Sequence, residues 1–198
     1  MTLYQEIAFM ILAYLWGSVP FGYLLTKYFA GKNILKLGSG NIGSTNVRRI
    51  AGKKISILTQ LLDMLKGFFP IALFLFFDLD TTVPYYIFLL ALGVIIGHDF
   101  SLFLKFKGGK GVNTTLGASV LLIPYSVIIS VAIYFVVKRR FKYVSLGSIA
   151  LAIAMPISEL IIHQTTPAFY FLFASSILII LLHRQNITRL IGGNELKS

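Results

Sequence analysis

The residues best suited to chemistry form a short segment rich in lysine and glycine, residues 105–111, between two long apolar stretches. Glycine lets backbone N–H groups approach an anion closely because no Cβ intervenes, and lysine supplies a point charge for a phosphate. A basic loop can also serve only to orient a membrane protein. The segment therefore predicts a phosphate-binding loop only if other parts of the chain support it.

Three further polar segments have compositions that suit an anion. Residues 38–49 combine glycine, serine, threonine and asparagine with a final arginine pair, and such amides, hydroxyls and guanidinium groups together bind polyanions. Residues 145–148 and 183–189 add serine, histidine, asparagine and arginine. The four segments predict a site for one or more phosphates.

Several kinds of chemistry are excluded. The chain has no cysteine and lacks H-E-x-x-H and G-x-S-x-G, and the loop departs from a Walker motif at Leu104 and Gly111. We predict neither a metal nor a cofactor, and a helix-end hydrogen bond for His98. The carboxylates near the polar segments are few, namely Asp63, Asp99 and Glu195. This scarcity of bases favours transfer from an already activated donor.

The composition is that of a membrane protein. Of 198 residues, 57% are hydrophobic and 13% are charged, and the mean hydropathy is +0.82. The net charge of +11 does not indicate a nucleic-acid partner, because the cations cluster between apolar runs as in cytoplasmic membrane loops. We expect one integral-membrane domain over residues 1–198.

The apolar stretches predict an all-α polytopic fold of about seven transmembrane helices, with the N-terminus outside, the C-terminus inside, and some helices short or broken. Pro124 divides one stretch into a hairpin, which returns the basic residues 138–142 to the cytoplasm. All Lys and Arg except Lys66 then lie in or beside cytoplasmic segments. The expected spans are 3–28, 55–77, 84–103, 112–122, 125–137, 144–162 and 167–182.

The span that follows the glycine segment is too short to cross a membrane. Its roughly 16 Å length is about half of a hydrocarbon core of about 30 Å. We therefore expect this helix to begin in a wet cavity, with its N-terminal amides directed at whatever the loop holds. Within span 55–77, Asp63 and Lys66 share one face, which predicts either an internal ion pair or a direct substrate role.

Taken together, these features predict a cytoplasmic site for phosphate at the mouth of an apolar groove, which suits a substrate that is half lipid and half anion. Two other classes of function fit parts of the pattern. An organic-phosphate transporter would need a polar path to the outer face, where Glu159 and His163 are the nearest candidates. A scaffold would use its basic loops only to bind anionic lipid.

The chain resembles the acyl-phosphate-dependent glycerol-3-phosphate acyltransferases of the bacterial inner membrane, over nearly its whole length. Two positions depart from the expected pattern: Ser101 stands where proline is common, and Asn113 replaces a usual alanine. The motifs that carry the resemblance are 38–47 with Arg49, 106–112, 183–190 with Gly193 and Glu195, 17–22, and 63–67.

The resemblance implies transfer of an acyl group from acyl phosphate to the 1-hydroxyl of sn-glycerol 3-phosphate, which gives lysophosphatidic acid and phosphate. It implies that neither acyl-CoA nor acyl carrier protein is the direct donor. The partners are then the two substrates and membrane lipid, in a multi-pass protein of the bacterial inner membrane. Oligomeric state and acyl-chain preference stay open, and a monomer is compatible with the sequence.

Our hypothesis for the site divides its residues by role. Lys110 and the amides of Gly108, Gly109 and Gly111 stabilise phosphate charge, with Lys107 and Asn41 beside them. A second group holds the other anion and comprises Arg49, His183 and Asn186. A third group orients substrate oxygens by hydrogen bonds and comprises Ser39, Thr45 and Ser148. Which phosphate meets which group stays open, and a substrate phosphate oxygen can take the hydroxyl proton in place of a protein base.

Overall fold

The structure, a computed structural model, describes residues 1–196, and within this range it contains helices and no strand. The predicted all-α fold is confirmed. The chain divides into two compact units, Met1–Leu121 and Leu122–Ser198, and each is described by itself. The expectation of a single domain stays a prediction.

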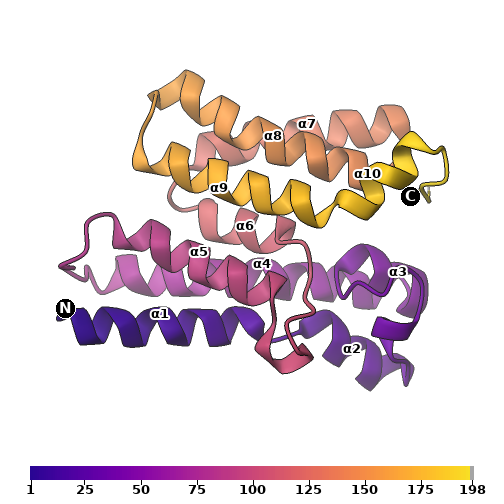
Figure 1. Ribbon diagram of the computed structural model, residues 1–198, viewed down its shortest axis with the longest axis horizontal. Helices are drawn as coiled ribbons and strands as arrows, with labels where there is room; N and C mark the ends of the chain where they lie inside the picture. Colours follow the sequence, from indigo (N-terminus) through magenta and orange to yellow (C-terminus); the bar gives the residue numbers. More distant parts are fainter. Residues whose placement is uncertain (197–198) are drawn as a thin grey trace. The chain divides into compact units, whose positions relative to one another are not determined.

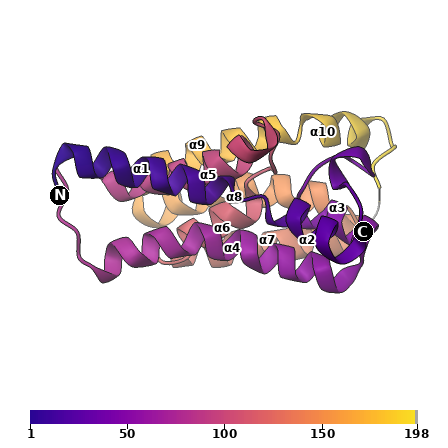
Figure 2. The same ribbon diagram turned by 90° about the horizontal axis from the view of Figure 1, so that it is seen from below.

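Unit 1 is built on three long helices that lie side by side, α1, α4 and α5, with the short helix α6 packed against α4 and α5 (Figures 1 and 2). Two further helices, α2 and α3, pack against each other and against α4. The bounds are α1 (Leu3–Ser18), α2 (Phe21–Ala30), α3 (Ser44–Ala51), α4 (Lys53–Phe76), α5 (Tyr86–Asp99) and α6 (Val112–Ser119), with 3₁₀ turns η1 (Ile34–Lys36) and η2 (Leu102–Leu104).

The first expected span is broken rather than continuous. It divides into α1 and α2 at Val19 and Pro20, because proline has no N–H to continue the helical ladder. Carbonyl groups at the break find partners elsewhere. The Ser18 oxygen accepts from Ser101 Oγ at 2.5 Å, and the Val19 oxygen accepts from Lys66 Nζ at 2.9 Å. Ser101, one of the two departures from the expected motif, thus ties the end of α1 to the segment before the glycine loop.

Glycines let the helices of unit 1 cross at backbone contact. A Cβ on Gly17 of α1 would lie 2.2 Å from the Val94 carbonyl oxygen of α5. A Cβ on Gly117 of α6 would lie 1.9 Å from the Met64 oxygen of α4, and Gly67 of α4 meets α6 in the same way. Small residues at crossings allow this close approach in membranes.

The helix after the glycine loop is shorter than expected. The predicted arm at 112–122 ends at Ser119, and its eight residues span about 12 Å. The next helix begins at Pro124, a residue that suits the first helical position because its missing N–H would have no partner there. The predicted interruption at Pro124 is therefore confirmed.

Unit 2 consists of a run of helices in which consecutive members pack against each other: α7 (Pro124–Phe141), α8 (Val144–His163), α9 (Pro167–Leu182) and α10 (Arg184–Ile191). Buried Glu159 of α8 is held inside the unit. It accepts from Ser126 Oγ of α7 at 2.6 Å, and its other oxygen lies 3.1 Å from His163 Nδ1. Glu159 and His163 thus serve helix packing here.

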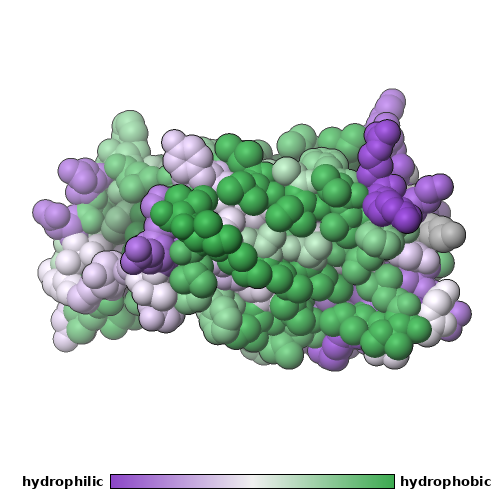
Figure 3. Space-filling view, turned by 90° about the horizontal axis from the view of Figure 1, so that it is seen from above, coloured by the Kyte–Doolittle hydropathy of each residue, from purple (hydrophilic) through white to green (hydrophobic). Residues whose placement is uncertain are grey.

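Four stretches of the described chain are long and apolar enough to cross a membrane, or five if α9 and α10, which meet at 58°, count as one bent span. The face in Figure 3 agrees, because hydrophobic side chains cover most of it and hydrophilic ones gather mainly toward its ends. All seven expected segments contain a helix. The count of seven crossings stays a prediction. The stretches are Leu3–Ala30, Lys53–Phe76, Tyr86–Leu104 and Val144–His163.

The glycine crossings generate a stability prediction. Gly117→Ala should lower the unfolding free energy by about 1–3 kcal/mol, because its Cβ meets rigid Met64 backbone. Gly93→Ala is the matched control, since its Cβ would meet the flexible end of Met10. Thermal unfolding of the purified protein in detergent, followed by circular dichroism, measures both. Equal midpoints for the two variants would contradict the prediction.

Candidate active site

Two of the polar segments predicted from the sequence meet within unit 1. Asn41 Nδ2 in the first loop donates to the Gly108 carbonyl oxygen in the second at 3.4 Å. Asn113, the second departure from the motif, places its Nδ2 3.5 Å from Ser44 Oγ. The structure therefore brings residues 38–49 and 105–111 into contact, as the chemistry of a shared anion site requires.

The first loop is organised by Asn46, which sequence reasoning did not single out. Its Oδ1 accepts from the Ser39 amide at 3.1 Å, and its Nδ2 donates to the Leu37 and Asn41 carbonyl oxygens at 3.0 and 2.9 Å. Asn46 is buried, so these bonds replace those that water would make. An asparagine inside a run of small polar residues was the available signal, since its amide can hold three backbone groups at once.

The candidate ligands of this loop lie at its surface. The side chains of Ser39 and Arg49 are exposed, and Thr45 is half-buried in the first turn of α3. Helix α3 was expected to be loop. It forms because Val47 packs into a small core with Ile34 and Ile42, which leaves the arginines on the opposite, solvated side.

The lysine–glycine loop begins with two strained residues. Lys105 and Phe106 have φ angles of 54° and 62°, a region that residues with a side chain rarely adopt. The Phe106 amide donates to the Ser101 carbonyl oxygen at 2.8 Å, which secures this turn. Lys107 is exposed, and Lys110 is half-buried.

The glycines of this loop rest on the end of α5. A Cβ on Gly108 would lie 2.1 Å from the His98 carbonyl oxygen, and a Cβ on Gly109 would lie 1.9 Å from His98 Nε2. Gly111 has a φ of 73° and lies against the Asp99 carboxylate. The Gly109 amide donates to the His98 carbonyl at 3.0 Å. That amide is engaged within the chain and is not directed at an anion in this structure, and its expected role toward phosphate stays a prediction.

Beneath the loop lie four buried ionisable residues. Lys66 Nζ is 3.2 Å from Asp63 Oδ1, so the predicted internal ion pair is confirmed. His98 Nδ1 is 3.5 Å from the same oxygen. The fourth is Asp99, whose oxygens have no hydrogen-bond partner among the described residues. Because Asp99 lies against Gly111, the residue before α6, a carboxyl group of the protein stands at that helix start, where we expected a substrate phosphate.

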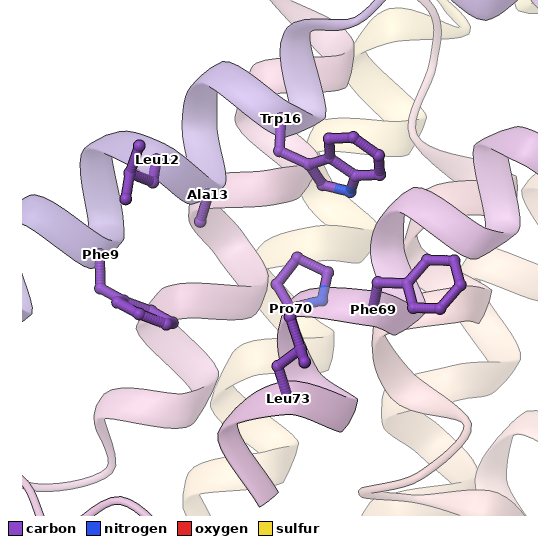
Figure 4. Close-up of a pocket in the computed structure, with 7 residues that line it drawn as sticks. All are labelled: Phe9, Leu12, Ala13, Trp16, Phe69, Pro70 and Leu73. Atoms are coloured by element: carbon purple, nitrogen blue, oxygen red, sulfur yellow. The ribbon is translucent and has the colours of Figure 1, made fainter. Parts of the chain in front are cut away.

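An apolar pocket of about 400 Å³ lies between α1 and α4 (Figure 4). The Trp16 indole lines it and donates to the Lys66 carbonyl oxygen at 3.0 Å. Unit 1 thus places an apolar recess next to the buried charges. The lining residues are Phe9, Leu12, Ala13, Trp16, Phe69, Pro70 and Leu73.

In unit 2 the polar residues are organised by Glu195. Its Oε1 accepts from Asn186 Nδ2 at 2.8 Å and Ser145 Oγ at 3.1 Å, and its Oε2 accepts from Arg189 Nε at 2.7 Å. Burial opposes ionisation of this carboxyl, but the hydrogen bonds from Arg189, Asn186 and Ser145 outweigh burial and hold the pKa below its ordinary value. Glu195 belongs to one of the sequence motifs, but the sequence did not predict its position at the centre of this cluster.

The remaining candidates of unit 2 lie close to this cluster in the sequence. His183, at the bend between α9 and α10, places its Nδ1 2.7 Å from the Ile179 carbonyl oxygen. Because a carbonyl only accepts, Nδ1 carries the proton. Ser148 is buried in α8, one turn after Ser145. Over residues 1–196, no three or more His, Asp or Glu side chains are grouped to hold a metal ion.

The known proteins that this chain resembles share one described activity. The family model described as glycerol-3-phosphate acyltransferase matches residues 7–193. A glycerol-3-phosphate acyltransferase of Clostridium acetobutylicum is 42% identical over 190 residues, which cover 94% of this chain and 96% of the relative. Another, from Endomicrobium trichonymphae, is 40% identical over 192 residues, 97% of this chain and 95% of the relative.

The fold also matches a solved protein. Crystal structures of PlsY, an integral membrane glycerol 3-phosphate acyltransferase, have TM-scores of 0.90 in the glycerol 3-phosphate form and 0.86 in the lysophosphatidic acid form. Both are 34% identical to this chain and cover 98% of it, over 96% and 95% of their own lengths. The chain is therefore a multi-pass membrane acyltransferase and belongs to the glycerol-3-phosphate acyltransferase family.

Proposed function

We propose that the protein transfers an acyl group from acyl phosphate to the 1-hydroxyl of sn-glycerol 3-phosphate, at the cytoplasmic face of the bacterial inner membrane. The products are lysophosphatidic acid and inorganic phosphate. The forms in which the solved relative was crystallised support the acceptor and the product, since one is a glycerol 3-phosphate form and the other a lysophosphatidic acid form.

The surroundings of three carboxyl groups support acyl phosphate as the donor. Asp63 is paired with Lys66, Glu195 is held by Arg189, and Asp99 is buried against Gly111. None of the three is arranged as a general base at the surface of the loops. A donor whose own leaving group can accept the hydroxyl proton removes the need for one, and acyl phosphate is such a donor.

The proposed step balances without a further reactant. The hydroxyl oxygen of glycerol 3-phosphate forms a bond to the acyl carbon, the bond from that carbon to the phosphate oxygen breaks, and the hydroxyl proton passes to the departing phosphate. Lys110 stabilises the charge that grows on this phosphate, and positioning supplies much of the remaining rate. Lys107 and the amides of Gly108 and Gly111 assist Lys110.

The other proposed roles keep the grouping expected from the sequence, which draws on residues of both units. Arg49, His183 and Asn186 bind the second phosphate. Glu195 orients Asn186 from behind, because the side-chain amide nitrogen donates to its carboxylate. Asn41 stands with Lys107 beside Lys110 and the glycine amides, and the hydroxyl groups of Ser39, Thr45 and Ser148 orient substrate oxygens.

The proposed topology has seven helical crossings, the N-terminus outside and the C-terminus inside. The distribution of cations supports it, because the basic loops then all face the cytoplasm. Helix α6 is too short to cross alone, so together with α7 it supports the broken hairpin expected around Pro124.

The proposed role of Lys110 gives a direct prediction. Lys110→Ala should lower kcat by about 100-fold or more, the usual effect of removing one transition-state charge stabiliser. Lys54→Ala, an exposed lysine in the first turn of α4, is the control and should keep normal turnover. Phosphate release from acyl phosphate by the purified variants measures both. Near-normal turnover of Lys110→Ala would refute the role of the loop.

The donor is tested with purified protein in lipid vesicles. Acyl phosphate and glycerol 3-phosphate should yield lysophosphatidic acid and phosphate in equal amounts, and acyl-CoA should not replace acyl phosphate. Entry of glycerol 3-phosphate into the vesicles without acylation would instead indicate an organic-phosphate transporter.

The Glu195 cluster predicts both a binding effect and a pH effect. Glu195→Gln should raise the KM for glycerol 3-phosphate and lower the unfolding free energy by about 1–3 kcal/mol, since it weakens charge-assisted hydrogen bonds. In the native state the pKa of Glu195 lies below its ordinary value. The stability advantage of wild type over Glu195→Gln is therefore fully present above the ordinary glutamate pKa of about 4.3. It is lost as the pH falls through the native pKa.

Thermal midpoints of wild type and Glu195→Gln across that pH range measure this difference. Asp78→Asn, a change at an exposed carboxylate, is the matched control and should keep the wild-type profile. A gap between wild type and Glu195→Gln that does not shrink on acidification would show that the cluster does not stabilise the ionised carboxylate.

A further inference from the structure

We infer that His98 is a positioning residue for the acyl transfer: its imidazole and its backbone carbonyl support Gly109 and thereby fix the place of Lys110. This inference rests on the proposed function, because that function assigns Lys110 to a phosphate. It concerns a residue that contacts the loop from below and is itself buried, with 4% of its surface exposed.

The contact between His98 and Gly109 is unusually specific. The Gly109 amide donates to the His98 carbonyl oxygen at 3.0 Å. A Cβ on Gly109 would meet His98 Nε2 at 1.9 Å, Cε1 at 2.6 Å and Cδ2 at 2.8 Å. The three nearest atoms all belong to the imidazole, so the ring is the first group that a Cβ at this position would meet.

The neighbouring glycine contacts His98 differently. The nearest atoms to a Cβ on Gly108 are the His98 and Asp99 carbonyl oxygens, at 2.1 and 2.4 Å. These are backbone atoms, which stay in place whatever side chain residue 98 carries. Gly108 and Gly109 therefore form a matched pair, in which only Gly109 depends on the imidazole.

The imidazole in turn lies beside a buried ion pair, in electrostatic contact with it but without a hydrogen bond from Nδ1 among the described residues. Its Nδ1 lies 3.5 Å from Asp63 Oδ1, and that oxygen lies 3.2 Å from Lys66 Nζ. Lys66 also donates to the Val19 carbonyl oxygen at 2.9 Å. Because polar groups at membrane depth are costly unless paired, these contacts favour one arrangement of the ring. Through Asp63 and Lys66, the ring thus connects the lysine–glycine loop with α4 and with the break between α1 and α2.

In this arrangement the imidazole positions the loop, and the lysines of the loop act on the substrate. The imidazole lies under the glycine backbone, and the lysines project from the same loop. A support of this kind should affect kcat, because transition-state stabilisation depends on placement to within fractions of an ångström. It should leave the KM for glycerol 3-phosphate largely unchanged.

A double-mutant cycle tests the inference with full-length protein and acyl phosphate as donor. Gly109→Ala should lower kcat at least tenfold, and adding His98→Ala should recover several-fold of that loss, because removal of the ring makes room for the new methyl group. Gly108→Ala is the matched comparison, and adding His98→Ala to it should recover nothing. The KM for glycerol 3-phosphate should stay within about twofold throughout, the size of effect expected for contacts that do not bind this substrate.

All rates are measured below the thermal midpoints of the variants, so that a loss of folding is not read as a loss of turnover. If His98→Ala does not fold, His98→Asn takes its place in both cycles. Asparagine is smaller than histidine and keeps a side-chain N–H that can reach Asp63. His98→Asn should also retain more activity than His98→Val, which fills at least as much space but has no N–H, whereas a simple space-filling role would favour valine.

Additive losses in the Gly109 cycle, or equal recovery in the Gly108 cycle, would overturn the inference. Failure of the proposed function gives a different result. If another donor proves to be the true one, or Lys110→Ala stays active, the coupling between positions 98 and 109 is still measurable with the working donor. Absence of coupling together with normal acyl-phosphate turnover refutes the role of His98 alone.

Discussion

The structure of unit 1 depends on the pairing of charges below the membrane surface. Asp63 and Lys66 are both buried and lie 3.2 Å apart, and neither would be tolerated at this depth without a partner. Lys66 uses its remaining capacity on the Val19 carbonyl, which the break at Pro20 had left without a helical donor. Asp63 in turn faces His98 at the end of α5. One ion pair therefore connects the α1–α2 break with the residues below the lysine–glycine loop.

Glycine serves two separate purposes in this unit. In the helices it allows backbones to touch, as at Gly17 and Gly117, so that short and broken helices gain packing contacts. In the loop it allows the chain to lie directly on His98 and Asp99. Both uses shorten the distance between polar backbone and buried charge. The loop can therefore hold a fixed shape even though its own lysines are at the surface or only half-buried.

The sequence predicted the elements that depend on local chemistry. Long apolar runs gave the helices, and Pro124 marked an interruption, because the missing N–H of proline acts regardless of tertiary context. It did not predict α3 and α10, which are eight-residue helices with few apolar positions. Nor did it identify Asn46 and Glu195 as the centres of their clusters, since the partners of a buried polar group depend on chain segments brought together only by folding. For the same reason the sequence did not predict that the Gly109 amide is bonded to the His98 carbonyl oxygen.

The polar residues discussed above fall into a buried set, bonded within the protein, and an exposed set. Asn46, Glu195 and His98 are buried and bonded within the protein, whereas Ser39 and Arg49 remain exposed. An enzyme with a protein base would concentrate its sensitivity in that one residue. Here the proposed reaction relies on the placement of cations and amides, so sensitivity should extend to the buried residues that place them. Under the proposed reaction, the buried residues that place the loop therefore contribute to the rate together with Lys110.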